Sequence, residues 1–130
     1  MYRHKATLSA LIVSSSQKAA DYLQDILSRL RFSPVANAVS IAEAKRRQLE
    51  YRFDLVIINA PLPDDFGLEF AEALCTDSSV GVILFVKAEL LEQVSYKVED
   101  YGVLTFPRPG TRQSITSAIR LATATHNRLS

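Results

Sequence analysis

Polar side chains directly follow the short apolar runs of this chain. Because these side chains carry hydroxyl, amide and cationic groups, the chemistry they offer is hydrogen bonding and the binding of an anion. The serines also have a simpler use as helix N-caps, and a lysine or arginine in a loop often only points into water. The positions are Ser14, Ser15 and Ser16 after residues 8–13, Asn59 after 55–58, Lys87 after 80–86 and Arg108 just beyond 103–106.

Residues for nucleophilic, zinc or flavin chemistry are missing or misplaced. The single cysteine, Cys75, cannot form an internal disulfide, which fits a reducing cytoplasm. The two histidines, His4 and His126, lie near the ends of the sequence, away from any catalytic or zinc-binding pattern. A flavin carrier would need a glycine in its phosphate loop and aromatic walls, but the serine run has no glycine and the chain has no Trp. We therefore expect no enzyme activity, no metal site and no cofactor.

Apolar runs of strand length alternate with amphipathic segments of helical period, and this alternation must position the polar residues. The all-apolar run 55–58 is typical of a central parallel strand that is buried on both faces. Ser40, with Glu43 three residues later, has the spacing of a helix capping box. The pattern predicts strands over 7–13, 34–39, 55–58, 80–86 and 103–106. It predicts helices over 17–31, 41–51, 67–76, 89–101 and about 111–128.

Five strand–helix units in one chain predict the fold class. Such units form a parallel sheet with helices on both faces, because each crossover connection is right-handed. We expect an α/β, flavodoxin-like, doubly wound five-stranded sheet of order 2-1-3-4-5, with residues 1–130 as a single domain. Ligands of such sheets bind beyond the carboxyl ends of the strands, which is where the polar residues should gather.

Composition and charge exclude several classes of protein. The chain has 130 residues, 48% of them hydrophobic, and a formal net charge of +1, so neither disorder nor general nucleic-acid binding is expected. No apolar run approaches the length of about 20 residues that a membrane span needs, so we expect a soluble cytoplasmic protein. The charge is unevenly spread, with ten acids against two lysines in residues 54–100 and four arginines without an acid in 101–130.

Over its whole length the chain resembles the receiver domain of response regulators, a CheY-like fold. The segment Leu55-Val-Ile-Ile-Asn-Ala-Pro-Leu-Pro-Asp-Asp-Phe-Gly-Leu-Glu is similar to the third strand of that family and the loop after it. Val86-Lys87-Ala88-Glu89 resembles the end of the fourth strand, and Tyr101-Gly102 and Arg108-Pro109 resemble the region of the fifth. The last segment, with Arg112-Gln113 and Arg120-Leu-Ala-Thr-Ala-Thr-His-Asn-Arg-Leu, looks like receivers that lead into ANTAR antitermination domains. No such output domain is expected within the 130 residues.

The positions that carry chemistry in the family differ here. The resemblance implies two acids for Mg²⁺ where this chain has Ser14 and Ser15, and an aspartate acceptor where it has Asn59. It further implies a Thr or Ser at Lys87, an aromatic switch residue at Thr105, and a lysine before a cis-proline at Arg108 and Pro109. An amide cannot form an acyl phosphate, and Lys87 and Arg108 make the pocket positive, which repels Mg²⁺. The sequence therefore indicates a pseudo-receiver that binds no Mg²⁺ and needs no phosphate.

A pseudo-receiver is expected to act in signal transduction and transcription regulation through protein contacts. The candidate interaction face holds Val94, Val98, Tyr101, Ile115 and Ile119, with an acidic stretch opposite a basic final helix, which suits a homodimer. Lys87 could pair with a carboxylate at the pocket rim, and the candidates are Asp64, Asp65 and Glu89. The alternative is a sensor that binds a small anionic or phosphorylated ligand through Lys87 and Arg108.

Overall fold

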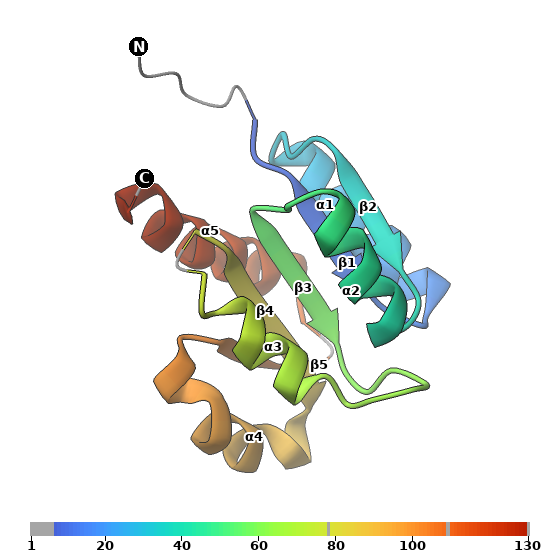
Figure 1. The fold of residues 1–130 in the computed structure, drawn as a ribbon, viewed down its shortest axis with the longest axis vertical. Coiled ribbons are helices and arrows are strands. Elements are labelled where there is room, and N and C mark those ends of the chain that lie inside the picture. The colour runs from blue at the N-terminus through green and yellow to red at the C-terminus, as the bar shows by residue number, and fades with distance from the viewer. Residues whose placement is uncertain (1–6, 78, 109, 130) are drawn as a thin grey trace.

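A five-stranded parallel sheet of order β2-β1-β3-β4-β5 forms the centre of the molecule (Figure 1). The computed structural model describes residues 7–77, 79–108 and 110–129 of the chain. The strands are β1 (Ala10–Val13), β2 (Val35–Ala38), β3 (Leu55–Asn59), β4 (Gly81–Lys87) and β5 (Leu104–Arg108). The structure thus confirms the predicted fold class and strand order.

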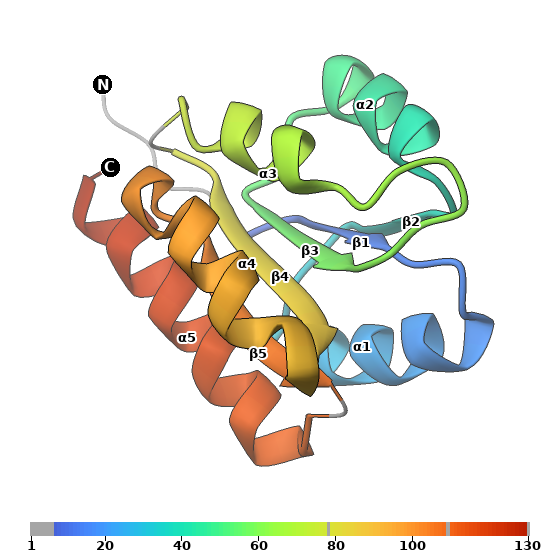
Figure 2. The same ribbon diagram turned by 90° about the horizontal axis from the view of Figure 1, so that it is seen from below.

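Helices cover both faces of the sheet (Figure 2). They are α1 (Gln17–Arg29), α2 (Ile41–Glu50), α3 (Leu68–Leu74), α4 (Leu91–Val98) and α5 (Arg112–Leu129), with short 3₁₀ helices η1 (Ala88–Leu90) and η2 (Glu99–Tyr101) on either side of α4. Buried side chains of α1 and α5 pack on one face, and those of α2, α3 and α4 pack on the other. None of the described helices is long and apolar enough to cross a membrane.

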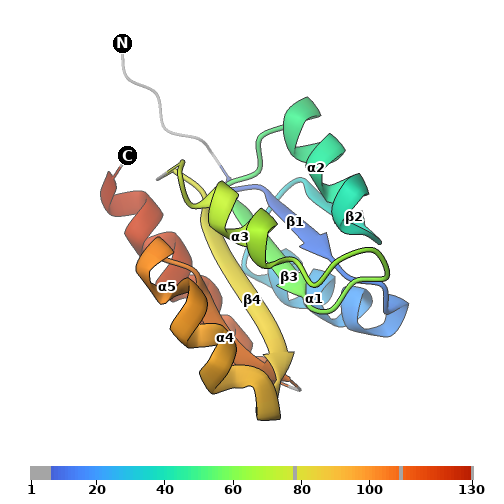
Figure 3. The same cartoon turned by 60° about the horizontal axis from the view of Figure 1, so that its bottom comes forward.

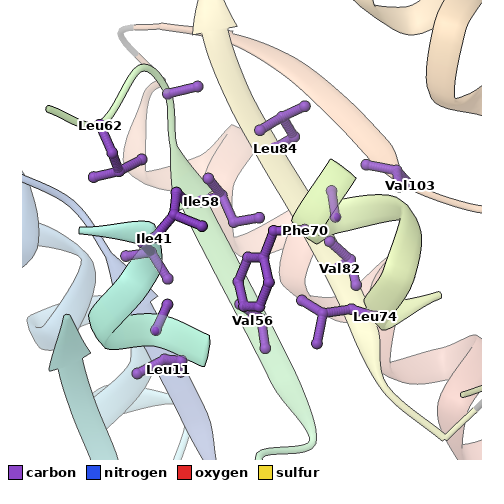
Figure 4. Close-up of a cluster of buried hydrophobic side chains, with 14 of the residues drawn as sticks. Leu11, Ile41, Val56, Ile58, Leu62, Phe70, Leu74, Val82, Leu84 and Val103 are labelled. Atoms are coloured by element: carbon purple, nitrogen blue, oxygen red, sulfur yellow. The ribbon is translucent and has the colours of Figure 1, made fainter. Parts of the chain in front are cut away.

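The two cores follow from the alternation of side chains along each strand. Leu55 and Ile57 of β3 point toward α1 and α5, whereas Val56 and Ile58 point toward α2 and α3. Figure 4 shows Val56 and Ile58 in one buried cluster with Phe70 of α3. All four β3 side chains are fully buried, which explains why this strand reads as a continuous apolar run.

Serine side chains cap the first two helices, as their sequence pattern predicts. Ser16 Oγ accepts a hydrogen bond from the Ala19 backbone N–H at the start of α1 (3.2 Å). Ser40 Oγ accepts from the Glu43 N–H at the start of α2 (3.1 Å), and the Glu43 carboxylate accepts from the N–H of Val39. These bonds satisfy N–H groups that have no partner within the helix.

Several predicted element boundaries were wrong. The first strand begins at Ala10 rather than at residue 7, because the N–H and hydroxyl of Ser9 donate to the Asp54 carboxylate instead of extending the strand. The helix predicted over 89–101 is divided into η1, α4 and η2. The fifth strand continues through Pro107 to Arg108, since an edge strand tolerates a residue without an N–H group. Pro109, for which a cis peptide bond was expected, lies outside the described residues.

Candidate functional site

The polar residues of the sequence pattern meet at the carboxyl edge of the sheet. Asn59, Lys87 and Arg108 are the last residues of β3, β4 and β5, and Ser14 directly follows β1. Val13 pairs with Ile58 in the sheet register, which brings the next residues, Ser14 and Asn59, to the same level. Lys87 pairs with Arg108 on the adjacent strand. Because the carboxyl ends of these parallel strands lie at one edge of the sheet, they gather side chains that lie up to 94 positions apart in sequence, from Ser14 to Arg108.

A chain of hydrogen bonds joins three of these residues. The Asn59 amide Nδ2 donates to Ser14 Oγ (3.1 Å), and Arg108 Nη1 donates to Asn59 Oδ1 over a long 3.4 Å. Ser14 and Asn59 are buried, at 4% and 9% exposure, whereas Arg108 is half-buried. The Arg108 guanidinium thus reaches the buried amide at the position where the resemblance implies a phosphoacceptor.

The serine run serves mainly the backbone at the start of α1. Ser14 Oγ accepts from the Ser16 N–H (3.1 Å) and donates to the Ser16 carbonyl (3.2 Å), while Ser16 caps the helix. Ser15 is exposed. The capping role is therefore the one that the structure shows for Ser16, and Ser14 joins the cap to Asn59.

The carboxylates proposed as partners of Lys87 are otherwise engaged or form no ion pair with it. Asp64 accepts from the backbone N–H groups of Ile41 (2.9 Å) and Ala42 (3.0 Å) at the start of α2, and these bonds hold the pKa of its carboxyl below the usual range. Asp65 accepts from the N–H of Gly67 (2.8 Å). Within the described residues no ion pair joins Lys87 to Asp64, Asp65 or Glu89. The loop after β3 is thus fastened to α2 rather than to the strand-end cations.

A cavity of about 920 Å³ opens beside these residues, between α1 and the start of α5. Asn59, Lys87, Glu89 and Arg108 line it, and so do residues that the sequence analysis missed or assigned elsewhere. Among these are Lys18, Tyr22 and Leu23 on α1, Phe85 on β4 and Ile115 on α5. Lys18 and Tyr22 are four residues apart, so they lie on the same face of α1. This spacing, in a helix that begins at the carboxyl edge of the sheet, is the sequence signal that could have identified them.

Contacts between α1 and α5 support one wall of the cavity. Arg112 Nη2 forms an ion pair with Asp25 Oδ2 (2.7 Å), and the Arg112 guanidinium lies 5.5 Å from the centre of the Tyr22 ring. Arg112 and then Arg29, both bonded to Asp25, lower the pKa of its carboxyl. The ring of Tyr22 is therefore held against α5 by a cation–π contact.

Thr105 and the predicted interaction face lie elsewhere. Thr105 is half-buried on β5, pairs with Leu84 in the sheet register and is not among the described residues that line the cavity. The face prediction was wrong for four of its five residues, because Val94, Val98, Ile115 and Ile119 are all buried. The first two belong to the core under α4 and the other two to the opposite core under α5. Only Tyr101 of this set is exposed.

The fold is similar to that of receiver domains in solved structures. The structure superimposes on the receiver domain of an HD domain-containing protein from Pseudomonas fluorescens with a TM-score of 0.82 and 21% identity, over 98% of this chain and 96% of that one. A CheY-like receiver domain protein from Methanospirillum hungatei gives a TM-score of 0.82 and 18% identity, over 96% and 100% of the chains. A two-component transcriptional regulator from Clostridium phytofermentans gives 0.82 and 17%, over 94% and 97%.

No family model matches the sequence, and no curated protein sequence matches it. Identities of this size establish the fold, which is that of a CheY-like response-regulator receiver domain.

Proposed function

We propose that this chain is a receiver-like signalling domain that works without aspartyl phosphorylation and acts by protein contact rather than by catalysis. The observation that supports the proposal is Asn59, an amide at the end of β3 that is hydrogen-bonded to Ser14 and Arg108. A receiver transfers a phosphoryl group to a carboxylate, which an amide cannot replace as a nucleophile. We place this role in cytoplasmic signal transduction and transcription regulation, on the resemblance given above.

The residues around Asn59 do not fit the Mg²⁺ that receivers use. Mg²⁺ prefers hard, anionic oxygen ligands, and it would neutralise charge on a transferring phosphoryl group. Ser14 is neutral, and its hydroxyl is already used by the backbone of Ser16. Within the described part of the chain, no group of three or more His, Cys, Asp or Glu side chains could hold a metal ion. Lys87 and Arg108 supply cations in place of a metal.

We further propose that the partner is a second copy of this chain. Helices α4 and α5 pack on opposite faces of the sheet near its β5 edge, α4 with one core and α5 with the other (Figures 2 and 3). The α4 side carries exposed Tyr96 and Tyr101, at 80% and 51% exposure, among the exposed acids Glu92, Glu99 and Asp100. Arg120 is exposed on α5, and residues 101–130 contain no acid. A two-fold contact would place the acidic side of one copy against the basic helix of the other.

Incubation of the full chain with Mg²⁺ and acetyl phosphate, followed by intact mass measurement, tests the absence of phosphorylation. A phosphoryl group adds about 80 Da. We expect no gain for the native chain and none for Asn59→Asp, because the acids that hold Mg²⁺ are still missing. The matched control combines Asn59→Asp with Ser14→Asp and Ser15→Asp, is checked for folding by circular dichroism, and is expected to gain the group. Labelling of the native chain would overturn the proposal, and labelling of Asn59→Asp alone would overturn the argument that these residues do not fit Mg²⁺.

A further inference from the structure

We propose that the cavity between α1 and α5 binds an amphipathic anion, namely a phosphate or carboxylate attached to a flat apolar body. The proposal concerns the binding of a ligand, whether or not the domain is phosphorylated, so it goes beyond the signalling role proposed above. Its volume of about 920 Å³ lies within the range of pockets that hold small organic ligands. Both cationic and apolar side chains line the cavity, and together they indicate the ligand class.

The cations at the strand ends form no ion pair with a described carboxylate, although Glu89 also lines the cavity. Lys87 and Arg108 are register partners on adjacent strands, so two like charges stand side by side at the edge of the sheet. Like charges on neighbouring strands repel each other. Within the described residues, no carboxylate forms an ion pair with either side chain. A bound anion would remove the repulsion between them.

The Arg108 guanidinium has N–H donors that could bind that anion. A guanidinium carries five N–H groups in a planar fork that matches the two oxygens of a phosphate or carboxylate. Among the described residues, Nη1 donates one hydrogen bond, to Asn59 Oδ1, over a long 3.4 Å. The Nε atom is buried without a hydrogen-bond partner among the described residues. Lys18, which also lines the cavity, lies at the second position of α1, where the positive end of the helix dipole adds to its charge.

Part of the cavity lining is apolar and pre-formed. Phe85, Ile115 and Leu23 contribute buried side chains from β4, α5 and α1, and Tyr22 adds a ring that is 38% exposed. The contact of Tyr22 with Arg112, and the ion pair of Arg112 with Asp25, hold this wall in place without a ligand. Inorganic phosphate would leave the wall uncovered, whereas an aromatic or heteroaromatic body would fill it.

Calorimetric titration of the full chain with 1-naphthyl phosphate, inorganic phosphate and 1-naphthol tests the proposal. We expect naphthyl phosphate to bind at least about tenfold more tightly than either half alone, with an affinity that falls as salt is added. 1-Naphthoate shows whether a carboxylate can replace the phosphate. Equal affinity for inorganic and naphthyl phosphate would overturn the amphipathic class, and no binding of naphthyl phosphate would overturn the site.

Variants then assign the binding to the named residues. Arg108→Gln and Lys87→Gln are expected to weaken naphthyl phosphate about tenfold or more, while Lys97→Gln, an exposed lysine on α4, leaves the affinity unchanged. Lys18→Gln, at an exposed helix position, is expected to weaken binding several-fold and carries little risk for folding. If the single variants Lys18→Gln and Arg108→Gln both bind naphthyl phosphate with native affinity, the assignment is contradicted. Because the readout is a dissociation constant without Mg²⁺ or a phosphodonor, its failure leaves the phosphorylation result unaffected.

Discussion

The hydroxyl of Ser14 supports three other groups at once. It accepts from the Asn59 amide and from the Ser16 N–H, and it donates to the Ser16 carbonyl. A serine hydroxyl has one hydrogen and two lone pairs, so all of its bonding capacity is used. Since Ser14 is 4% exposed, no bulk water stands ready to replace these bonds. The residue therefore couples the start of α1 to the end of β3.

Replacing Ser14 by alanine is expected to lower the free energy of unfolding by about 1–3 kcal/mol, because the Asn59 amide and the Ser16 N–H lose a buried acceptor. Urea denaturation measures the change. Ser15→Ala is the matched control, since Ser15 is exposed, and its effect should stay within about 0.5 kcal/mol. Equal losses for the two variants would mean that the hydrogen bonds of Ser14 contribute nothing specific.

Individual site residues were predictable from the sequence where the fold rule applies directly to them. Asn59, Lys87 and Arg108 each end a strand, and parallel strands bring their carboxyl ends to one edge. Lys18 and Tyr22 were missed because they lie on a helix, where their direction depends on how α1 packs against α5. The suggested Lys87 partner Asp64 bonds to the backbone of α2 instead, a contact over 23 positions that no local pattern reveals.

The presence and type of each helix and strand could be predicted from sequence periodicity, but the residues at which they begin and end could not. Every predicted strand and helix is present, because apolar alternation reports which face of an element is buried. The ends depend on contacts made elsewhere in the chain. The Ser9 N–H donates to the Asp54 carboxylate, so it does not extend β1. Pairing with β4 extends β5 through Pro107 to Arg108. The second of these differences decides the site, since it places Arg108 beside Lys87.

The start of α3 depends on a glycine that has both an unusual backbone and close neighbours. Gly67 has φ +106°, and a Cβ there would lie 3.2 Å from Ile58 Cγ2 and 3.3 Å from Ile41 Cδ1. Gly67→Ala should therefore destabilise the fold by about 2–4 kcal/mol in urea denaturation, from backbone strain and overpacking together. Gly102→Ala is the control, because Gly102 has φ +91° but no atom within 4 Å of the added Cβ. A loss for Gly102→Ala as large as that for Gly67→Ala would contradict the packing part of the argument.

Across the whole molecule, opposite charges collect on neighbouring parts of the chain. Residues 54–100 carry ten acids and two lysines, and residues 101–130 carry four arginines and no acid. The predicted interaction face failed because its apolar residues were chosen by helical spacing, which marks the side of a helix that packs on the sheet. Val98 and Ile119 are accordingly almost fully buried, and the exposed residues of the same helices are Tyr96 and Arg120. The surface available for a partner is thus aromatic and charged rather than aliphatic.

If a second copy covers this surface, sedimentation equilibrium should show a dimer whose dissociation constant rises with salt, because the contact joins charges of opposite sign. Tyr96→Ala is expected to weaken the dimer about tenfold, since an exposed tyrosine of this kind is typical of residues that dominate an interface. Arg120→Glu should weaken it further by placing like charges opposite each other.

Leu49→Ala is the control, because Leu49 is 88% exposed on α2, an element that does not contribute to this surface. A chain that stays monomeric at about 100 μM in low salt would contradict the dimer, since a standard-sized interface gives tighter association. A dimer that responds to Leu49→Ala but not to Tyr96→Ala would place the contact on a different face.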